Sequence, residues 1–407
     1  MTGRIIVFIL FFAFFYDLKI SEPILTVRFF MGAIGFVLFL FEMMANRVTF
    51  KKRYLSIIFV YSLLLLWNYF TCIINNSNEF QSLYELKFLL IIFFAAFFLV
   101  KVSSRYITSV SQLFDIIILL ALVQCSIAVV SQFSDSVHAF VLANANALEE
   151  FLEHEQETRL IGIGSAVFFG VLPTSSLASL ACVYQFFHSP MKRKTIYAIL
   201  FIIISFITFL MARTSLFALI SAIVLYIYYS RESGRSIRKS KKTNISLLIV
   251  LPIVVFIIFR LVETYMSEQM FEWAFNSFSR DSQNSTVREI YDWYAFTTID
   301  TETFWIGDAR LTDNDGYYMG LDAGYLRAIF YFGLIGLLLY FFYQYYIARI
   351  IFKATNNKDL WLFVLAYFLF YFFIMIKGYT SIAKELLFLL VMIDYGKLKI
   401  NENRVLS

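Results

Sequence analysis

Charged residues are scarce in this sequence. They make up 15% of its 407 residues, whereas soluble domains carry about 25%. The mean hydropathy of +0.73 also shows that apolar residues predominate. So little charge cannot give a folded domain a polar surface, which excludes a water-soluble fold. We also expect no nucleic-acid partner.

Cysteine is rare too, with three residues in the whole chain. Cys72, Cys125 and Cys182 each fall inside an apolar segment, where neither a disulfide framework nor a thiolate metal site is expected. The stretch from Asp313 to Gly316 begins like a calcium loop. It lacks the distal Glu of such loops, which favours a plain turn. We therefore expect no metal and no cofactor.

Apolar runs, by contrast, are abundant. A helix needs about 20 mostly apolar residues to cross the hydrocarbon layer of a membrane, and such runs recur along the whole chain. They predict an all-α, polytopic integral membrane protein with about twelve transmembrane helices. The expected spans lie near residues 4–20, 24–45, 55–74, 86–102, 113–133, 166–187, 196–212, 214–229, 245–261, 323–347, 361–376 and 382–395.

The connections between these spans alternate in charge. The basic ones are Arg47 to Arg53, Lys101 to Arg105, Lys192 to Lys194, Arg231 to Lys242, Arg349 to Lys358, and Lys397 to Arg404. Positive charge marks the cytoplasmic side, so both termini are predicted to be cytoplasmic. The opposite side is net acidic and carries two large outer loops, at about residues 134–165 and 262–322. We expect a single transmembrane domain over residues 1–407, without a soluble domain.

Loops as long as the two outer ones usually carry function. In the first loop, Asn144 to Glu157 predicts a short acidic helix. The second loop is rich in aromatic residues, and its Thr286 to Glu289 capping box predicts another helix. We expect the second loop to be ordered and to rest on the membrane.

Arginine is the informative residue on the acidic outer side, where it occurs as Arg159, Arg213, Arg260, Arg280, Arg288, Arg310 and Arg327. A guanidinium group stays charged and matches phosphate oxygens with a planar fork of donors. A group of arginines at the outer leaflet therefore suits a lipid-linked phosphate or pyrophosphate. For any single arginine, an equal alternative is that it snorkels or pairs with a nearby acid, as Arg288 would with Asp292.

Four stretches in and beside the outer loops carry a further signal. They are Arg159 to Gly170, an Arg and a Gly with ten residues between them; Leu210 to Leu219, around Arg213 and Thr214; Arg288 to Gly307, with Trp293 and Phe304-Trp305-Ile306-Gly307; and Asp322 to Gly336, with Arg327 and Gly333. In this order and on this side, they resemble the Wzy-type polymerases of O-antigen and capsular polysaccharide, which share a broad fold with the O-antigen ligases. Asp322 stands where ligases and some polymerases have His, which counts against a ligase.

The resemblance implies a metal-independent glycosyltransferase. A glycan on undecaprenyl pyrophosphate would move from its carrier to the terminal sugar hydroxyl of another lipid-linked repeat unit. The donor, the acceptor and the bilayer would be partners, with a chain-length regulator as a further candidate. Arg159, Arg213, Arg288 and Arg327 would bind the pyrophosphate, with Arg159 and Arg288 as catalytic groups. Asp322 would be the general base or would only fix Arg327, and both roles stay open.

Two other functions stay open from the sequence. An O-antigen ligase-like transferase would use the same type of carrier. A lipid-linked oligosaccharide flippase would be a non-enzymatic transporter. Transporters place charges or broken helices near the middle of the membrane, however, and most of the expected spans lack charge. For each function we expect a multi-pass protein of the bacterial cytoplasmic (inner) membrane whose active face is periplasmic or extracellular.

Overall fold

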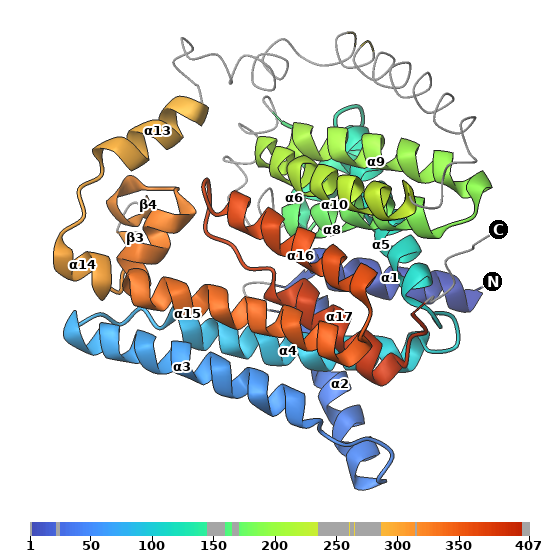
Figure 1. Ribbon diagram of the computed structural model, residues 1–407, viewed down its shortest axis with the longest axis horizontal. Coiled ribbons are helices and arrows are strands. Elements are labelled where there is room, and N and C mark those ends of the chain that lie inside the picture. Colours follow the sequence, from blue (N-terminus) through green and yellow to red (C-terminus); the bar gives the residue numbers. More distant parts are fainter. Residues whose placement is uncertain are drawn as a thin grey trace.

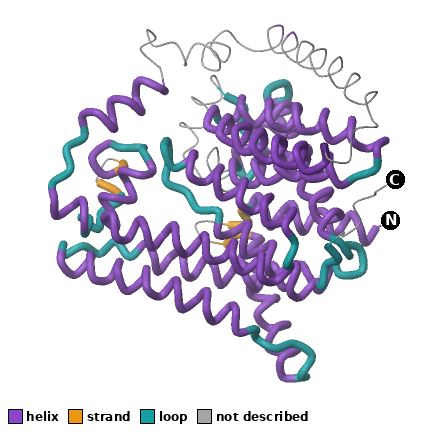
Figure 2. The backbone as a smooth tube through the Cα atoms, viewed as in Figure 1, coloured by secondary structure: helices purple, strands orange, loops and turns teal. Residues whose placement is uncertain are grey.

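Long helices dominate the computed structural model of the chain (Figures 1 and 2). The structure describes residues 2–21, 25–144, 159–164, 171–234, 260, 264, 286–313 and 316–400. The span expected at 245–261 and the acidic helix expected at 144–157 fall almost entirely outside these residues, and Arg280 does so as well.

The other expected spans fold as helices. They are α1 (Thr2–Tyr16), α2 (Val27–Met44), α3 (Lys52–Ile74), α4 (Gln81–Ser103), α5 (Val110–Ser131), α8 (Leu172–His188), α9 (Met191–Met211), α10 (Leu216–Gly234), α15 (Gly324–Thr355), α16 (Lys358–Ile374) and α17 (Ala383–Gly396). Within the described residues, 7 helices are long and apolar enough to cross a membrane, which confirms a helical membrane protein. The total of about twelve spans and the side of the termini stay predictions.

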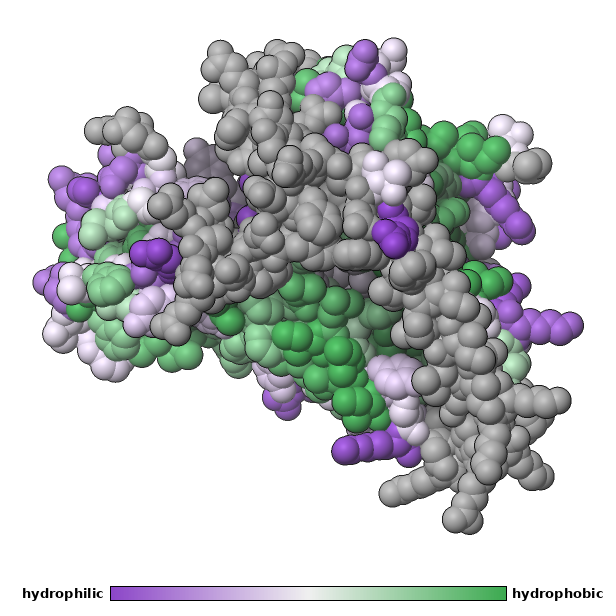
Figure 3. Space-filling view, turned by 90° about the horizontal axis from the view of Figure 1, so that it is seen from above, coloured by the Kyte–Doolittle hydropathy of each residue, from purple (hydrophilic) through white to green (hydrophobic). Residues whose placement is uncertain are grey.

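The periphery of the helix bundle, which would face lipid, is apolar. Val37, Phe41, Phe59 and Leu66 are each 64 or 65% exposed. Figure 3 shows a hydrophobic zone in the middle of the visible face and hydrophilic residues toward its two ends. In water this surface would be costly, whereas the hydrocarbon layer of a membrane accommodates it. Helices such as α2 and α3 therefore bury one side in the bundle and leave the other for lipid, whereas α8 and α17 are buried almost all round.

Contacts among the connections support the expected sidedness. At the end of the bundle formed by the predicted outer loops, the Asn75 side-chain amide donates to the Gly307 carbonyl oxygen at 2.8 Å. At the opposite end, Lys51 and Arg53 lie 3.4 Å and 2.8 Å from Asp394 Oδ1. Segments assigned to one side by their charge thus contact each other across the sequence. Which end faces the cytoplasm stays a prediction.

The second outer loop is ordered over the part that the structure describes. The capping box at Thr286 opens a helix as expected, α13 (Thr286–Phe296), which is followed by α14 (Thr301–Trp305). An antiparallel pair, β3 (Thr312–Asp313) and β4 (Gly316–Tyr317), then leads to the short 3-10 helix η4 (Tyr318–Gly320). These elements lie at one end of the molecule (Figure 1).

The all-α expectation misses several small elements. β3 and β4 form one two-stranded sheet, and β1 (Lys19–Ser21) and β2 (Leu25–Thr26) form another after α1. The first outer loop also contains a helix before the expected one, α6 (Asp135–Ala143). Strands this short have no periodicity from which a sequence could predict them.

Two glycines join the second outer loop to α15. Gly333 has φ 66° and ψ 179°, a conformation open essentially to glycine alone, and it kinks α15. Gly307, with φ 86°, packs directly against it, and a Cβ atom on either residue would overlap the backbone of the other segment. The kink leaves the Phe332 carbonyl oxygen to accept from Trp67 Nε1 at 2.7 Å. Two of the stretches that carry the family resemblance therefore meet at this junction.

The connection between α16 and α17 does not form a simple outer turn. It begins where the Tyr325 amide donates to the Met375 carbonyl oxygen at 2.9 Å, and it ends where the Ile382 amide donates to Gln344 Oε1 at 3.0 Å. Tyr325 lies at the start of α15, before the kink at Gly333, and Gln344 lies well after it. The connection thus runs down along α15 into the bundle, and α17 starts below the outer surface.

We predict opposite membrane sides for Glu302 in α14 and Lys52 in α3, both of which are exposed. The native cysteines are buried, so a single introduced cysteine reports its own position. In right-side-out vesicles, an impermeant maleimide should label Glu302→Cys and should label Lys52→Cys only after permeabilisation. The reverse pattern would contradict the charge-based orientation.

We predict that Gly333→Ala destabilises the junction, by roughly 1–3 kcal/mol for the backbone conformation alone and by more because of the overlap with the Trp305 carbonyl group. Gly320→Ala is the matched control, since Gly320 also has φ 66° but has open space around it. Thermal unfolding of the detergent-solubilised protein measures both. Equal losses of thermal stability in the two variants would argue against tight packing at Gly333.

Candidate functional site

Four charged side chains meet where α13, the start of α15 and the α16–α17 connection come together. We call Asp322, Arg327, Lys377 and Glu289 the outer cluster. Lys377 Nζ lies 3.8 Å from Asp322 Oδ2 and 3.3 Å from Glu289 Oε2. Arg327 Nη1 lies 3.8 Å from Asp322 Oδ1. Asp322 is therefore held between two cations from different segments.

Aromatic rings pack against both cations of the outer cluster. The Arg327 guanidinium carbon lies 3.9 Å from the centre of the Tyr317 ring in β4. Lys377 Nζ lies 4.2 Å from the centre of the Trp293 ring in α13. A cation over an aromatic face is attracted by the ring quadrupole, and the attraction grows as water is excluded. The rings thus fix the two positive charges beside Asp322.

Asp322 precedes α15 and has an altered acidity. Burial raises the pKa of Asp322 above the usual 3.8, and the charges of Lys377 and Arg327 oppose that shift only in part. A carboxyl group with a raised pKa binds a proton at a higher pH than an ordinary aspartate, which suits proton transfer. The ion pair with Arg327 is equally what a purely positioning role requires, so the geometry is compatible with both expected roles.

Arg159 and Arg213 belong to two segments that lie side by side. The Leu160 amide donates to the Leu210 carbonyl oxygen at 3.1 Å, which places the first outer loop beside the end of α9. Arg213 opens a short 3-10 helix, η2 (Arg213–Ser215), just before α10. Both arginines are half-buried. The structure therefore brings together the two backbone segments that carry these arginines, which are far apart in the sequence.

Arg288 lies on the exposed side of α13. Its side chain is 59% exposed, and its Nε atom lies 3.9 Å from Asp292 Oδ2. This contact is the alternative pairing that the sequence offered. The neighbouring Glu289 belongs to the outer cluster, so Arg288 stands at the edge of that cluster rather than within it.

The segments that carry Arg159 and Arg213 lie at the same end of the bundle as the outer cluster. The Phe217 ring at the start of α10 stacks on Phe373 at the end of α16, with centroids 5.8 Å apart. Arg213 lies one turn before Phe217, and Lys377 one turn after Phe373. The Arg159–Arg213 segments and the outer cluster are thus linked through the packing of α10 on α16.

A second set of charges lies inside the bundle, and we call Asp17, Arg28, Lys384 and Glu385 the buried ion cluster. Arg28 Nη1 lies 3.1 Å from Asp17 Oδ2, and Lys384 Nζ lies 2.9 Å from Glu385 Oε1. Arg28 Nη2 and Lys384 Nζ both donate to the Phe15 carbonyl oxygen, at 3.3 and 3.5 Å. The α1–α2 connection and the start of α17 thus share one ionic network.

Sequence reasoning missed two parts of this arrangement. The first is Lys377, because the preference of phosphate for arginine does not point to a lysine; the signal in the sequence is a lone lysine between two apolar runs. In the buried ion cluster, Lys384 and Glu385 fall within the expected span 382–395, and charges inside a span mark functional or paired groups. The Asp17–Arg28 ion pair, which meets Lys384 at the Phe15 carbonyl oxygen, comes from the opposite end of the chain, so this meeting could not be predicted.

Within the described residues, no group of three His, Cys, Asp or Glu side chains is placed to hold a metal ion. No family model, no curated protein and no solved structure matches this chain. A function can therefore be argued only from the residues and their placement.

Proposed function

We propose that this protein is a polysaccharide polymerase of the Wzy type. It would transfer a glycan from undecaprenyl pyrophosphate to the terminal sugar of another lipid-linked repeat unit, at the outer face of the bacterial cytoplasmic membrane. The observation that supports this most directly is the outer cluster, in which one carboxyl group of raised pKa lies between Arg327 and Lys377.

The proposed reaction needs two kinds of group. The acceptor hydroxyl oxygen forms a bond to the anomeric carbon of the donor, the bond from that carbon to the pyrophosphate breaks, and the hydroxyl proton leaves to a base. Cations stabilise the charge that develops on the departing pyrophosphate. Arg327 and Lys377 would supply such charge beside Asp322, and Arg288 would add to it at the edge of the outer cluster. Arg159 and Arg213 would add to it from the same end of the bundle. Asp322 is the candidate proton acceptor.

A second candidate function is transport of the lipid-linked unit. It is favoured by the buried ion cluster and by the non-helical backbone of residues 375–382, because transporters carry ionic groups and broken helices within the membrane.

Glycan analysis of cells lacking the protein distinguishes a polymerase, a ligase and a flippase. Single repeat units on the outer face support a polymerase. Complete but unattached chains indicate a ligase, and units trapped on the cytoplasmic face indicate a flippase.

In cells lacking the native protein, we predict that Arg159→Ala and Arg288→Ala fail to restore chain extension. Loss of one group that stabilises transition-state charge lowers a rate by about 100-fold or more. Arg310→Ala is the matched control, since Arg310 is an exposed outer arginine outside the proposed site. The measurement is glycan length by gel, with membrane insertion checked by immunoblot. Normal chains in both variants would refute these assignments.

We predict that the initial rate of chain extension by the reconstituted protein falls at low pH, with a midpoint above the usual pKa of aspartate. Only the ionised Asp322 carboxylate accepts a proton, and burial raises its pKa. Asp322→Asn should reduce the activity to a small residual rate that lacks this acidic limb. If Asp322 only positions Arg327, the asparagine amide can still contact that residue, and an active variant with an unchanged limb would exclude the base role.

A further inference from the structure

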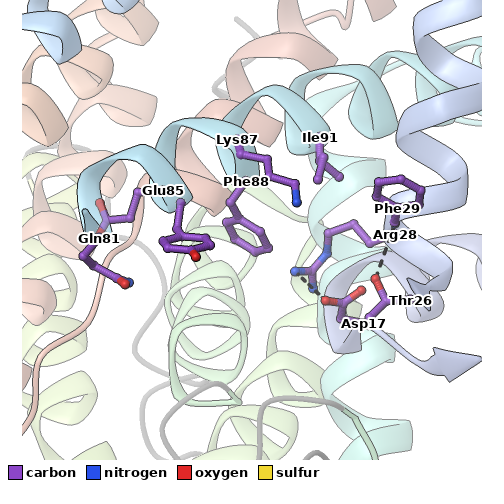
Figure 4. A pocket seen from close by; sticks show the side chains of 10 residues that line it. Asp17, Thr26, Arg28, Phe29, Gln81, Glu85, Lys87, Phe88 and Ile91 are labelled. Atoms are coloured by element: carbon purple, nitrogen blue, oxygen red, sulfur yellow. Dashed lines mark hydrogen bonds and ion pairs between the residues drawn. The ribbon is translucent and has the colours of Figure 1, made fainter. Parts of the chain in front are cut away.

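Two adjoining hollows lie along the contact between α2 and α4. The first has a volume of about 410 Å³ and is lined by Asp17, Arg28, Glu85 and Lys87 among others (Figure 4). The second is a groove of about 710 Å³. Phe29, Tyr84, Lys87 and Ile91 line both hollows, so a charged pocket passes directly into the groove.

The groove is apolar and faces outward from the bundle. Its lining includes Ala33 and Phe36 of α2 and Leu90 of α4, all of which are exposed. Along α4 the groove is lined from Leu83 to Phe94. The part beyond Lys87 is roughly 10 Å long at 1.5 Å per residue, which is shorter than one leaflet of a hydrocarbon layer about 30 Å thick. The groove therefore has the chemistry and the length to hold the first part of one lipid chain.

The pocket carries balanced charge. Its two acids are Asp17 and Glu85, and its two cations are Arg28 and Lys87. Arg28 is already paired with Asp17 through Oδ2, at 3.1 Å. Glu85 accepts a hydrogen bond from the Tyr379 hydroxyl at 3.1 Å. A polyanionic pyrophosphate would be poorly matched by a pocket whose formal charges sum to zero.

Two polar groups of this pocket have no partner among the described residues. Asp17 Oδ1 is buried and accepts no hydrogen bond. Lys87 lies within α4 and has an exposed side chain, and no ion pair joins it to another described residue. An uncompensated charge on a lipid-facing helix is costly, and so is an unsatisfied buried carboxylate oxygen. The pocket thus offers the Lys87 ammonium as a cation and Asp17 Oδ1 as an acceptor, and it adjoins a groove for a hydrocarbon chain.

We propose that this pocket and groove bind a zwitterionic phospholipid with a phosphoethanolamine headgroup. The Lys87 ammonium contacts the lipid phosphate, and the primary ammonium of the headgroup donates to Asp17 Oδ1. One acyl chain lies along the groove past Ala33 and Phe36. In Figure 4 the Lys87 side chain reaches from α4 toward the side on which Arg28 and Asp17 lie. The site shares no residue with the outer cluster and does not depend on the proposed reaction.

The same two groups explain a preference among headgroups. Phosphocholine has no N–H to donate to Asp17 Oδ1, because its nitrogen is quaternary. Phosphoglycerol has a phosphate for Lys87 but no cation for Asp17. Phosphoethanolamine satisfies both groups, because its phosphate contacts Lys87 and its primary ammonium donates to Asp17 Oδ1; a hydrogen bond between charged partners is stronger than one between neutral groups.

Native mass spectrometry of the detergent-solubilised protein tests the headgroup assignment. With equimolar phosphatidylethanolamine, phosphatidylcholine and phosphatidylglycerol of the same acyl chains, the first should be retained preferentially. Lys87→Gln should weaken its binding by about tenfold, the loss expected for one charge-assisted hydrogen bond. Lys52→Gln is the matched control, an exposed lysine at the opposite end of the bundle. Equal retention of the three lipids, or unchanged binding by Lys87→Gln, would overturn the proposal.

A second pair of variants tests the groove. Ala33→Trp should fill it and reduce phosphatidylethanolamine retention, because Ala33 lines the groove. Ile34→Trp should leave retention unchanged, since Ile34 is also exposed on α2 but does not line the groove. Neither position is tightly enclosed, so both variants should elute as folded protein. Equal effects of the two substitutions would contradict the assignment of the acyl chain.

Discussion

The hydrogen bonds of Gln344 determine how the last third of the bundle is arranged. Gln344 is fully buried in α15; its Nε2 donates to the Tyr371 hydroxyl at 2.7 Å, and its Oε1 accepts from the Ile382 amide at 3.0 Å. Non-helical backbone inside a membrane must find such partners, since no water is available there. This single side chain lets α17 begin within the bundle, and the position of α17 in turn places Lys384 beside the α1–α2 connection.

The lack of water inside the bundle also determines how its buried charges are paired. A charge removed from water is tolerated only when it is paired and hydrogen-bonded. Arg28 meets this condition with Asp17 and two backbone carbonyl groups, and Lys384 meets it with Glu385 and a third such contact. Losing one partner would leave its neighbour uncompensated, so these residues constrain one another. The buried ion cluster therefore ties α1, α2 and α17 together.

Residues 375–382 connect the two charged regions. The segment starts beside Lys377 in the outer cluster, passes Tyr379, which binds Glu85, and ends just before Lys384 in the buried ion cluster. Polar groups thus follow one stretch of chain from the outer end of the bundle into its interior. The proposed reaction uses Lys377 at the outer end of this segment, and the transport alternative rests on its non-helical backbone, so both proposals involve the same residues.

The sequence by itself determined the class of protein, because low charge and repeated apolar runs leave only a helical membrane fold. It also predicted α13 from its capping box and grouped the connections by charge. Only the tertiary structure decided which charges meet. Lys384 and the Phe15 carbonyl oxygen lie near opposite ends of the chain, and Lys377 and Asp322 lie in different connections. Each contact depends on how helices of similar apolar composition pack. Apolar periodicity specifies that a helix is buried or spans a membrane, but not which neighbour it meets.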